Sequence, residues 1–286
     1  MRTGVIGLGA MGAPMALNLH RAGLLGAVWN RSAGKAAALA ASTGCSAATS
    51  PADLASRVDA ILICVSADQD VLDIIEQMKP GLHPGQCVAD FSTVSAGTAR
   101  GAAAQLAPLG VDFLDTPVSG GVEGARNGQL AIMVGGDKAA LEKLQPVLSV
   151  LGRVITHFGG HGAGQAAKAT NQIMVAGIIR AVAEAMAFAD AQQLPLDRIV
   201  ATLSQGAAGS WYFANRAPFM IRGEYPAGFR VRLHAKDLKI CRDMAAQLGA
   251  HLPVVEDVLR EYQQLIEAGH ADEDISALYR LKRALF

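Results

Sequence analysis

A glycine motif close to the start of the chain restricts the possible folds more than any other feature. Residues 7–12 read GLGAMG, after the apolar run 3–7 and before the helical pattern 11–22. In this G-x-G-x-x-G spacing the glycines permit a tight turn, close approach of a pyrophosphate, and close packing of helix on strand. The N–H groups at the start of the helix can then bind phosphate. The alternative is a turn that needs glycines only for its own geometry. The motif predicts a dinucleotide site made by Gly7, Leu8, Gly9, Ala10, Met11 and Gly12.

The residues after the second apolar run indicate which dinucleotide binds. NAD sites usually carry an Asp or Glu here, which binds the ribose hydroxyls. This chain has Asn30, Arg31 and Ser32 instead, and a guanidinium can hold a 2′-phosphate by two charge-assisted hydrogen bonds. We therefore predict that these three residues bind the cofactor and that NADP(H) is favoured, with NAD(H) possible. The alternative is that Ser32 only caps the next helix and Arg31 is a solvated charge.

Short apolar runs alternate with helical patterns through the first half of the chain. Strands are predicted at residues 3–7, 27–29, 60–65 and 87–91, and helices at residues 11–22, 34–42, 51–56 and 71–78. Such alternation is typical of an α/β fold with a doubly wound parallel sheet. Further apolar runs, expected to extend that sheet, lie at residues 111–114, 130–134 and 154–158.

Strand signals stop near residue 160, and helical patterns follow. These cover residues 165–192, 196–204, 235–248, 253–268 and 275–283. A change of this kind marks a domain boundary, which we place in the segment 157–164. The predicted domains are a cofactor-binding α/β domain at residues 1–161 and an all-helical domain at residues 162–286.

Composition excludes several classes of protein. Lys plus Arg and Asp plus Glu each number 25, so no net charge favours nucleic acid or an anionic membrane as a partner. The four cysteines are scattered, which argues against a metal site or a disulfide framework and fits a cytoplasmic protein. The glycine motif begins so early that we expect no signal peptide. The apolar run 173–189 contains Arg180 and Glu184, and we expect it to be too short and too charged to span a bilayer.

Lys168 and Asn171 stand in the first turns of a long apolar helical pattern. Residues three apart on a helix project from one face, and the glycine-rich segment 159–164 before them permits close approach of the backbone. Ligands of such sheets bind outside the carboxyl ends of the strands, so a lysine there could meet the nicotinamide end of the cofactor. The alternative for Lys168 is a surface lysine whose stem covers apolar neighbours.

Other polar groups follow predicted strands or lie on the helical part of the chain. Ser119, with the N–H groups around Gly120 and Gly121, would form a nest for a small carboxylate substrate. A plain loop is the alternative reading of that segment. Val65, Ser66 and Thr93 complete the predicted cofactor-binding set of the α/β domain, and a second lysine, Lys236, stands on a helical pattern near the end of the chain. The alternative for Lys236 is the charged face of a helix.

Six stretches of the chain occur together in a known family. They are GLGAMGAPMALNL, WNR, FST, DTPVSGG, GxGxxxKxxNQ and GF…KDL. In order and wording they resemble the β-hydroxyacid dehydrogenases, a group that includes 3-hydroxyisobutyrate dehydrogenase and the tartronate, glyoxylate and succinic semialdehyde reductases. The likeness runs from Gly4 to Leu281. The related 6-phosphogluconate dehydrogenases are longer and have His-Asn where this chain has Asn171-Gln172, which argues against a sugar-phosphate substrate.

The resemblance implies a Rossmann domain and an all-helical domain joined by the long helix that carries Lys168. It implies catalysis by Lys168 with Asn171 beside it, and assembly into dimers or tetramers through the helical domain. The remaining implied roles are a substrate carboxylate held by Ser119, Gly120 and Gly121, and closure on cofactor and substrate by Thr93 and Lys236.

Residues and resemblance together predict an NAD(P)-dependent enzyme that interconverts a small hydroxy acid with its semialdehyde or oxo acid. Lys168 would stabilise negative charge on the reacting oxygen and exchange a proton with it. Trp211 and Phe229, which we expect in a glycine-flanked turn, would shape the pocket unless they only pack in a core. Alternatives for the whole chain are a redox-silent NADP(H)-binding module and an imine reductase, and the presence of Lys168 argues against both.

Overall fold

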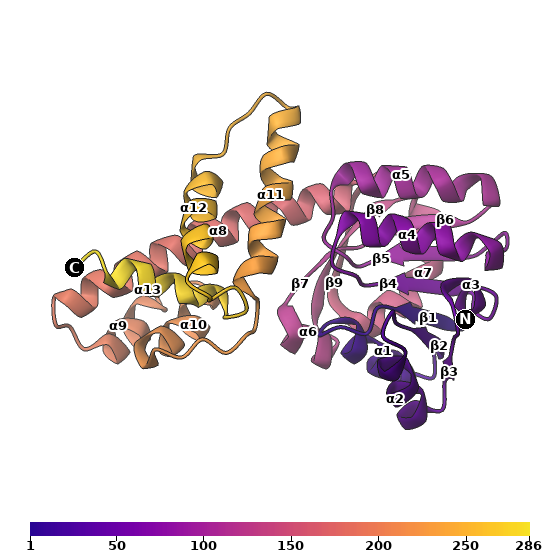
Figure 1. Ribbon diagram of the computed structural model, residues 1–286, viewed down its shortest axis with the longest axis horizontal. Helices are drawn as coiled ribbons and strands as arrows, with labels where there is room; N and C mark the ends of the chain where they lie inside the picture. Colours follow the sequence, from indigo (N-terminus) through magenta and orange to yellow (C-terminus); the bar gives the residue numbers. More distant parts are fainter. The chain divides into compact units, whose positions relative to one another are not determined.

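The computed structural model describes residues 1–286, which divide into two compact units, Met1–Lys168 and Ala169–Phe286 (Figure 1). The first unit is built on a nine-stranded sheet of order β3-β2-β1-β4-β5-β6-β8-β7, with β9 paired to β8. Its strands are β1 (Thr3–Ile6), β2 (Leu25–Trp29), β3 (Ser46–Ala47), β4 (Ala60–Ile63), β5 (Cys87–Asp90), β6 (Asp112–Asp115), β7 (Val118–Ser119), β8 (Leu130–Gly136) and β9 (Gly152–Gly159).

Strands β1 to β6 run parallel, so the predicted doubly wound sheet is confirmed for this part. The predicted runs 130–134 and 154–158 also join the sheet, but in the opposite direction, because β8 is antiparallel to β6 and β7 while β9 is parallel to β8. Parallel neighbours need a crossover that returns the chain to the same edge. After β6 and β7 the chain instead turns back through the short helix α6 (Gly121–Asn127) into β8.

Helices cover both faces of this sheet. They are α1 (Gly12–Arg21), α2 (Ala33–Thr43), α3 (Pro51–Ala55), α4 (Asp68–Met78), α5 (Ala96–Leu106), α6 (Gly121–Asn127) and α7 (Lys138–Leu151). Val5 and Ile6 are neighbours in β1 and both are fully buried, Val5 in a cluster with α1 and α7 and Ile6 in a cluster with α3, α4 and α5. Burial on both faces explains why the central strands read as continuous apolar runs.

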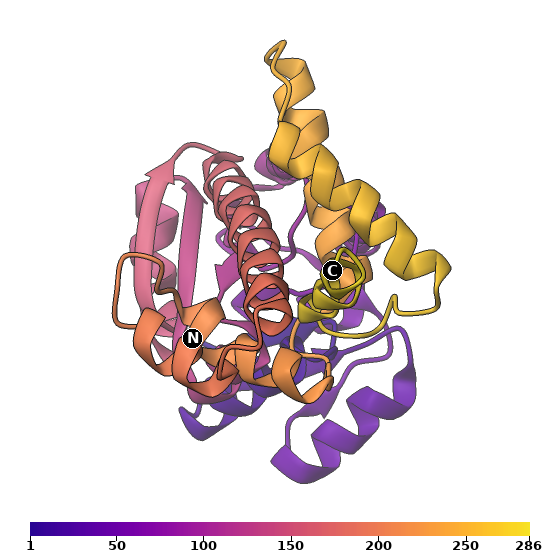
Figure 2. The same ribbon diagram turned by 90° about the vertical axis from the view of Figure 1, so that its left-hand side faces the viewer.

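The second unit is all-helical, as predicted. Most of α8 (Ala163–Ala191) belongs to it, followed by α9 (Leu196–Leu203), α10 (Trp211–Arg222), α11 (Val231–Gln247), α12 (Pro253–Glu267), a 3₁₀ turn (Ile275–Ala277) and α13 (Leu278–Arg283). Its core joins one side of α8 to α10–α13, with Tyr262 and Tyr279 among its largest buried side chains. Figure 2 looks at the fold from the side of α8 and α12.

Helix α8 is longer than the apolar run in the sequence indicated. It has 29 residues and a mean hydropathy of 1.5 over its most apolar stretch, so by length and composition alone it could cross a membrane. The expectation that this segment is too short was therefore wrong. Its buried residues Ala176, Ile179 and Ala183 lie in the core of the second unit, and Arg180 forms ion pairs with α12. These contacts identify α8 as a core helix.

Candidate functional site

The glycine turn after β1 has the sterics that a dinucleotide site requires. Gly7 has φ +93°, and a Cβ there would collide with the carbonyl oxygen of Cys64. A Cβ on Gly12 would collide with the carbonyl oxygen of Gly7, so helix and strand could not approach. A Cβ on Gly9 meets nothing within 4 Å, and the residue is exposed. The fold therefore needs Gly7 and Gly12, whereas at Gly9 only an approaching ligand would require the absence of a side chain.

Asn30, at the end of β2, fixes the shape of this turn. Its side-chain oxygen accepts the backbone N–H of Leu8 at 2.8 Å, and its side-chain nitrogen donates to the Ser32 carbonyl at 3.1 Å. This contact joins segments 22 residues apart in sequence. Spacing alone gave no sign of this contact, because the prediction that Asn30 binds the cofactor included no role in shaping the turn.

Arg31 and Ser32 are both exposed at the carboxyl end of β2. The Arg31 side chain is 88% exposed and its Nη1 lies 3.4 Å from Oδ1 of Asp70, in the first turn of α4. Ser32 occupies the N-cap position of α2, but its side chain makes no capping hydrogen bond. Capping therefore does not account for the Ser32 hydroxyl, and a guanidinium and a hydroxyl stand together at the predicted ribose position.

The other predicted cofactor residues of the first unit follow two neighbouring strands. Val65 and Ser66 come after β4, and the Val65 N–H donates to the Ser92 hydroxyl at 2.9 Å. Thr93 is half-buried and comes after β5. Because β2, β1, β4 and β5 are adjacent and parallel, all these residues lie at one edge of the sheet. That is the edge at which doubly wound sheets bind their ligands.

The first turn of α8 is attached to the same edge by two residues to which the sequence had assigned no role. Asp115, the last residue of β6, accepts the backbone N–H groups of Gly162 and Gln165 at 2.8 and 2.9 Å. The Gln165 side chain donates to the Ser92 carbonyl at 2.9 Å and accepts the Val94 N–H at 3.2 Å. Burial raises the pKa of the Asp115 carboxyl above its ordinary value, against the lowering effect of the two N–H donors.

Lys168 follows Gln165 by three residues on α8 and is only 7% exposed. The alternative reading of Lys168, a surface lysine with a solvated ammonium group, is therefore wrong. Both Lys168 and Asp115 stood in the stretches that carried the family resemblance, but the hydrogen bonds that attach the helix join residues 47 and 50 apart. Sequence spacing does not report such contacts.

Ser119 and the two glycines after it form the end of β7 and the start of α6. Ser119 is half-buried and pairs in register with Ala131 of β8. Gly120 and Gly121 have φ +128° and +61°, which other residues rarely adopt. The two glycines are thus required by the backbone of this turn, and both are exposed.

In the second unit a chain of polar contacts connects Asn171 with Lys236. The Asn171 amide donates to the Gln172 side-chain oxygen at 2.8 Å, and the Gln172 amide donates to Oδ2 of Asp237 at 2.6 Å. The other oxygen of Asp237 lies 3.1 Å from Nζ of Lys236. Gln172 and Asp237 are buried. Two predicted site residues on different helices are therefore held by a buried amide and a buried carboxylate.

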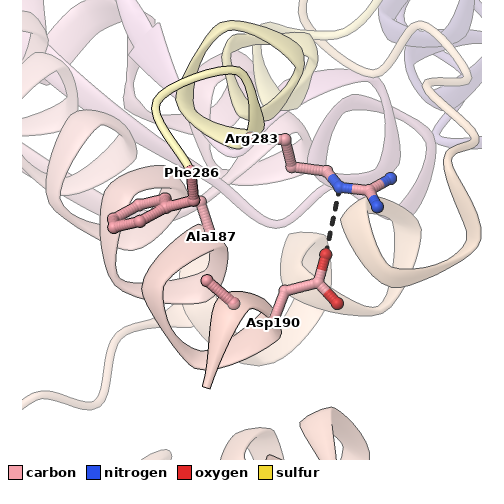
Figure 3. A pocket seen from close by; sticks show the side chains of 5 residues that line it. Ala187, Asp190, Arg283 and Phe286 are labelled. Atoms are coloured by element: carbon pink, nitrogen blue, oxygen red, sulfur yellow. Dashed lines mark ion pairs between the residues drawn. The ribbon is translucent and has the colours of Figure 1, made fainter. Parts of the chain in front are cut away.

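A surface hollow of about 270 Å³ on the second unit is not this site. Ala187, Asp190, Ala191, Arg283 and Phe286 line it, and Asp190 pairs with Arg283 at 3.0 Å (Figure 3). None of the predicted site residues is among them.

Two family models match the chain along most of its length. The NAD-binding domain of 6-phosphogluconate dehydrogenase matches residues 2–160, and the NAD-binding domain of NADP-dependent 3-hydroxyisobutyrate dehydrogenase matches residues 162–282. The chain belongs to the 3-hydroxyisobutyrate dehydrogenase family. It is thus an NAD(P)-dependent oxidoreductase of the β-hydroxyacid dehydrogenase type, and the family resemblance read from its motifs is confirmed.

Individual members of the family are similar over nearly their whole length. The chain is 36% identical to 2-hydroxy-3-oxopropionate reductase of Escherichia coli, covering 97% of this dehydrogenase and 96% of the relative. It is 35% identical to NAD-dependent L-serine dehydrogenase of Pseudomonas aeruginosa, covering 96% of each chain. The solved structure of Mycobacterium tuberculosis 3-hydroxyisobutyrate dehydrogenase with L-serine matches with a TM-score of 0.90 and 31% identity, over 99% and 100% of the two chains.

Proposed function

We propose that this dehydrogenase interconverts a small hydroxy acid with its semialdehyde or oxo acid, with NADP(H) preferred over NAD(H) and Lys168 as general acid and base. The similar enzymes named above carry L-serine and 2-hydroxy-3-oxopropionate in their names, which supports a small carboxylate as substrate. The nicotinamide, when bound, supplies or accepts the hydride. Every other task falls to the protein.

The observation that carries the proposal is the burial of Lys168 on a helix turn that is hydrogen-bonded to the ligand-binding edge of the sheet. An ammonium in such a place stabilises negative charge on the substrate oxygen during reduction and gives it a proton, and the neutral amine takes the proton back during oxidation. Arginine could not do this, because its pKa is too high.

The other predicted residues bind and orient. Ser119 with Gly120 and Gly121 holds the substrate carboxylate, Asn171 orients the reacting groups without adding charge, and Lys236 supplies a second cation. Thr93, Val65 and Ser66 contact the cofactor. The turn Gly7, Leu8, Gly9, Ala10, Met11 and Gly12 takes the pyrophosphate, and Asn30, Arg31 and Ser32 take the phosphorylated ribose.

We further propose that the dehydrogenase is a cytoplasmic homodimer or homotetramer. The family resemblance supports assembly, and α8 leaves two large apolar side chains open to solvent, Met174 at 62% and Phe188 at 53% exposure. The four cysteines form no disulfide, in keeping with a reducing compartment.

The test is a spectrophotometric assay of NADPH and NADH consumption with a panel of small semialdehydes and oxo acids, and of the reverse reaction with hydroxy acids including L-serine. Lys168→Ala should lower kcat by a factor of about 10² to 10⁴ while the dissociation constant for NADPH stays within a few-fold of wild type. Lys168→Arg should be equally inactive. Turnover by Lys168→Ala at the wild-type rate would refute the assigned role. Activity on cyclic imines but not on oxo acids would favour an imine reductase, and cofactor binding with no turnover on any compound would favour a redox-silent module.

A further inference from the structure

The ion pair between Arg31 and Asp70 lies at the edge where the adenosine end of a cofactor would bind. Arg31 follows β2, and Asp70 stands in the first turn of α4, which follows β4. Strands β2 and β4 flank β1 on its two sides, and the glycine turn begins where β1 ends. The pair therefore joins the two segments on either side of the glycine turn.

This contact is weak and open to water. One nitrogen of Arg31 lies 3.4 Å from one oxygen of Asp70, and the two side chains are 88% and 32% exposed. A phosphate can take two parallel hydrogen bonds from the same guanidinium and carries up to twice the charge of a carboxylate. A 2′-phosphate would therefore displace the Asp70 carboxylate from the Arg31 guanidinium, but the existing ion pair has to break first.

The other acidic residue in the first turn of α4 has a different task. Asp68 accepts the N–H of Ser95 at 2.8 Å and the hydroxyl of Thr98 at 2.6 Å, which joins α4 to the start of α5. The contact of Asp70 with Arg31 does not join α4 to another helix, unlike the hydrogen bonds of Asp68. The Asp70 carboxylate is the one that meets the cation expected to select the cofactor.

We infer that Asp70 is a specificity-determining residue whose carboxylate competes with the 2′-phosphate of NADP(H) for the Arg31 guanidinium. Each molecule of NADP(H) has to displace the Asp70 carboxylate from Arg31, whereas NAD(H) does not. Asp70 therefore reduces the preference for NADP(H) over NAD(H) that Arg31 creates. The inference rests on the proposed use of Arg31 in cofactor selection. Removing the negative charge of Asp70 should therefore increase the selectivity of this dehydrogenase for NADP(H) over NAD(H).

The test measures dissociation constants of NADPH and NADH from nicotinamide fluorescence, without substrate, for wild type, Asp70→Asn, Arg31→Ala and the double variant. Asp70→Asn should lower the constant for NADPH about two- to fivefold, the range expected for an exposed ion pair. The constant for NADH should change less than twofold. In the Arg31→Ala background the gain should vanish, and added salt should reduce it because salt screens exposed charges.

Asp112→Asn is the matched control. It also removes one carboxylate from an exposed ion pair, with Lys143 at 3.3 Å, but it stands at the amino end of β6, the opposite edge of the sheet. It should leave both constants unchanged. An unchanged or raised NADPH constant in Asp70→Asn, or an equal gain for both cofactors, overturns the inference while the proposed function stands. Failure of the wild type to bind either dinucleotide would overturn the proposed function itself.

Discussion

The carboxylate of Asp115 accepts the backbone N–H of Gln165 at 2.9 Å, and this bond joins the end of β6 to the first turn of α8. A second bond, from the Gly162 N–H at 2.8 Å, gives the helix a bidentate cap. Lys168 lies about one turn further along α8. The helix turn that carries the proposed catalytic amine is therefore attached to the sheet by a carboxylate 53 positions earlier in the chain.

Asp115→Ala should remove this attachment and lower both stability and turnover. Losing the acceptor of two buried N–H groups is expected to lower the free energy of unfolding by about 1–3 kcal/mol. Turnover should fall more than cofactor affinity, because the change moves Lys168 but leaves the glycine turn untouched. Urea unfolding, kcat and the NADPH dissociation constant of the same preparation check this. A stable variant with wild-type kcat would show that the attachment does not position the lysine.

The raised pKa of Asp115 gives a pH dependence of defined sign. Between the ordinary carboxyl pKa of 3.8 and its higher folded value, the native state binds more protons than the unfolded state, so the contribution of this group to stability falls as pH rises. The difference in unfolding free energy between wild type and Asp115→Asn should therefore shift against the wild type as pH rises from below 3.8 through the folded pKa. A difference moving the other way would mean that the N–H donors outweigh burial. The control is Asp112→Asn, three residues earlier, because the Asp112 side chain is 45% exposed and no such pH-dependent shift in the difference in unfolding free energy is expected there.

Gly9 and Gly12 should separate ligand binding from folding. Gly12→Ala forces a Cβ onto the Gly7 carbonyl oxygen, and overpacking of this kind is expected to destabilise by about 1–3 kcal/mol. Gly9→Ala places its Cβ in open space and should change stability by less than about 0.5 kcal/mol. It should nevertheless weaken NADPH binding at least about tenfold, because the methyl group occupies the path of the pyrophosphate. Thermal unfolding and fluorescence titration measure the two effects, and tight NADPH binding by a well-folded Gly9→Ala would contradict the assigned role.

What the sequence could predict depends on how local each feature is. The glycine turn, the central strands and the long helix are read from neighbouring residues, and the structure confirms them. Helices α5 and α7 escaped prediction because the buried face of α5 consists mainly of alanines, which give only a weak apolar pattern, and because α7 contains Pro146 in its interior. The reversed direction of strands β8 and β9 was not predicted, because an apolar run does not indicate in which direction its strand will run.

The candidate site divides in the same way. The residue types that face a cofactor or a substrate could be named from motifs, since spacing places them after strands or on a helix face. The groups that hold those residues could not be named, since Asp115, Gln165 and Asp237 form hydrogen bonds with residues 47 to 73 positions away in the chain. For Trp211 the predicted secondary structure was wrong. It was expected in a turn but begins helix α10, with Ser210 as its N-cap.

Gln172→Leu should destabilise the second unit and impair catalysis together. The substitution removes the 2.6 Å donor to Asp237 and the 2.8 Å acceptor of Asn171, and a buried carboxylate that loses a donor is expected to cost about 1–3 kcal/mol. The Michaelis constant for the substrate should rise, because Asn171 and Lys236 are no longer held. Gln263→Leu is a matched control, since it breaks a 2.7 Å amide–carboxylate bond to Glu267 on an exposed face of α12. It should change stability by less than about 0.5 kcal/mol, and equal losses in the two variants would refute the special role of the buried pair.

Trp211→Ala tests whether this side chain shapes substrate preference. Trp211 is 61% exposed, with the Arg216 guanidinium 5.1 Å from its ring, so core packing does not explain it. The loss of stability should be about 1 kcal/mol or less, the range of an exposed cation–π contact. If the ring contacts the substrate tail, the order of kcat/KM values across the oxo-acid panel should change, with the largest shifts for the longest substrates, because each methylene in contact with an apolar wall is worth about 1–3 kcal/mol. An unchanged order would show that Trp211 does not contact the substrate. The exposed ring would then be a candidate for the proposed subunit interface, and sedimentation of the same variant would detect a loss of the oligomer.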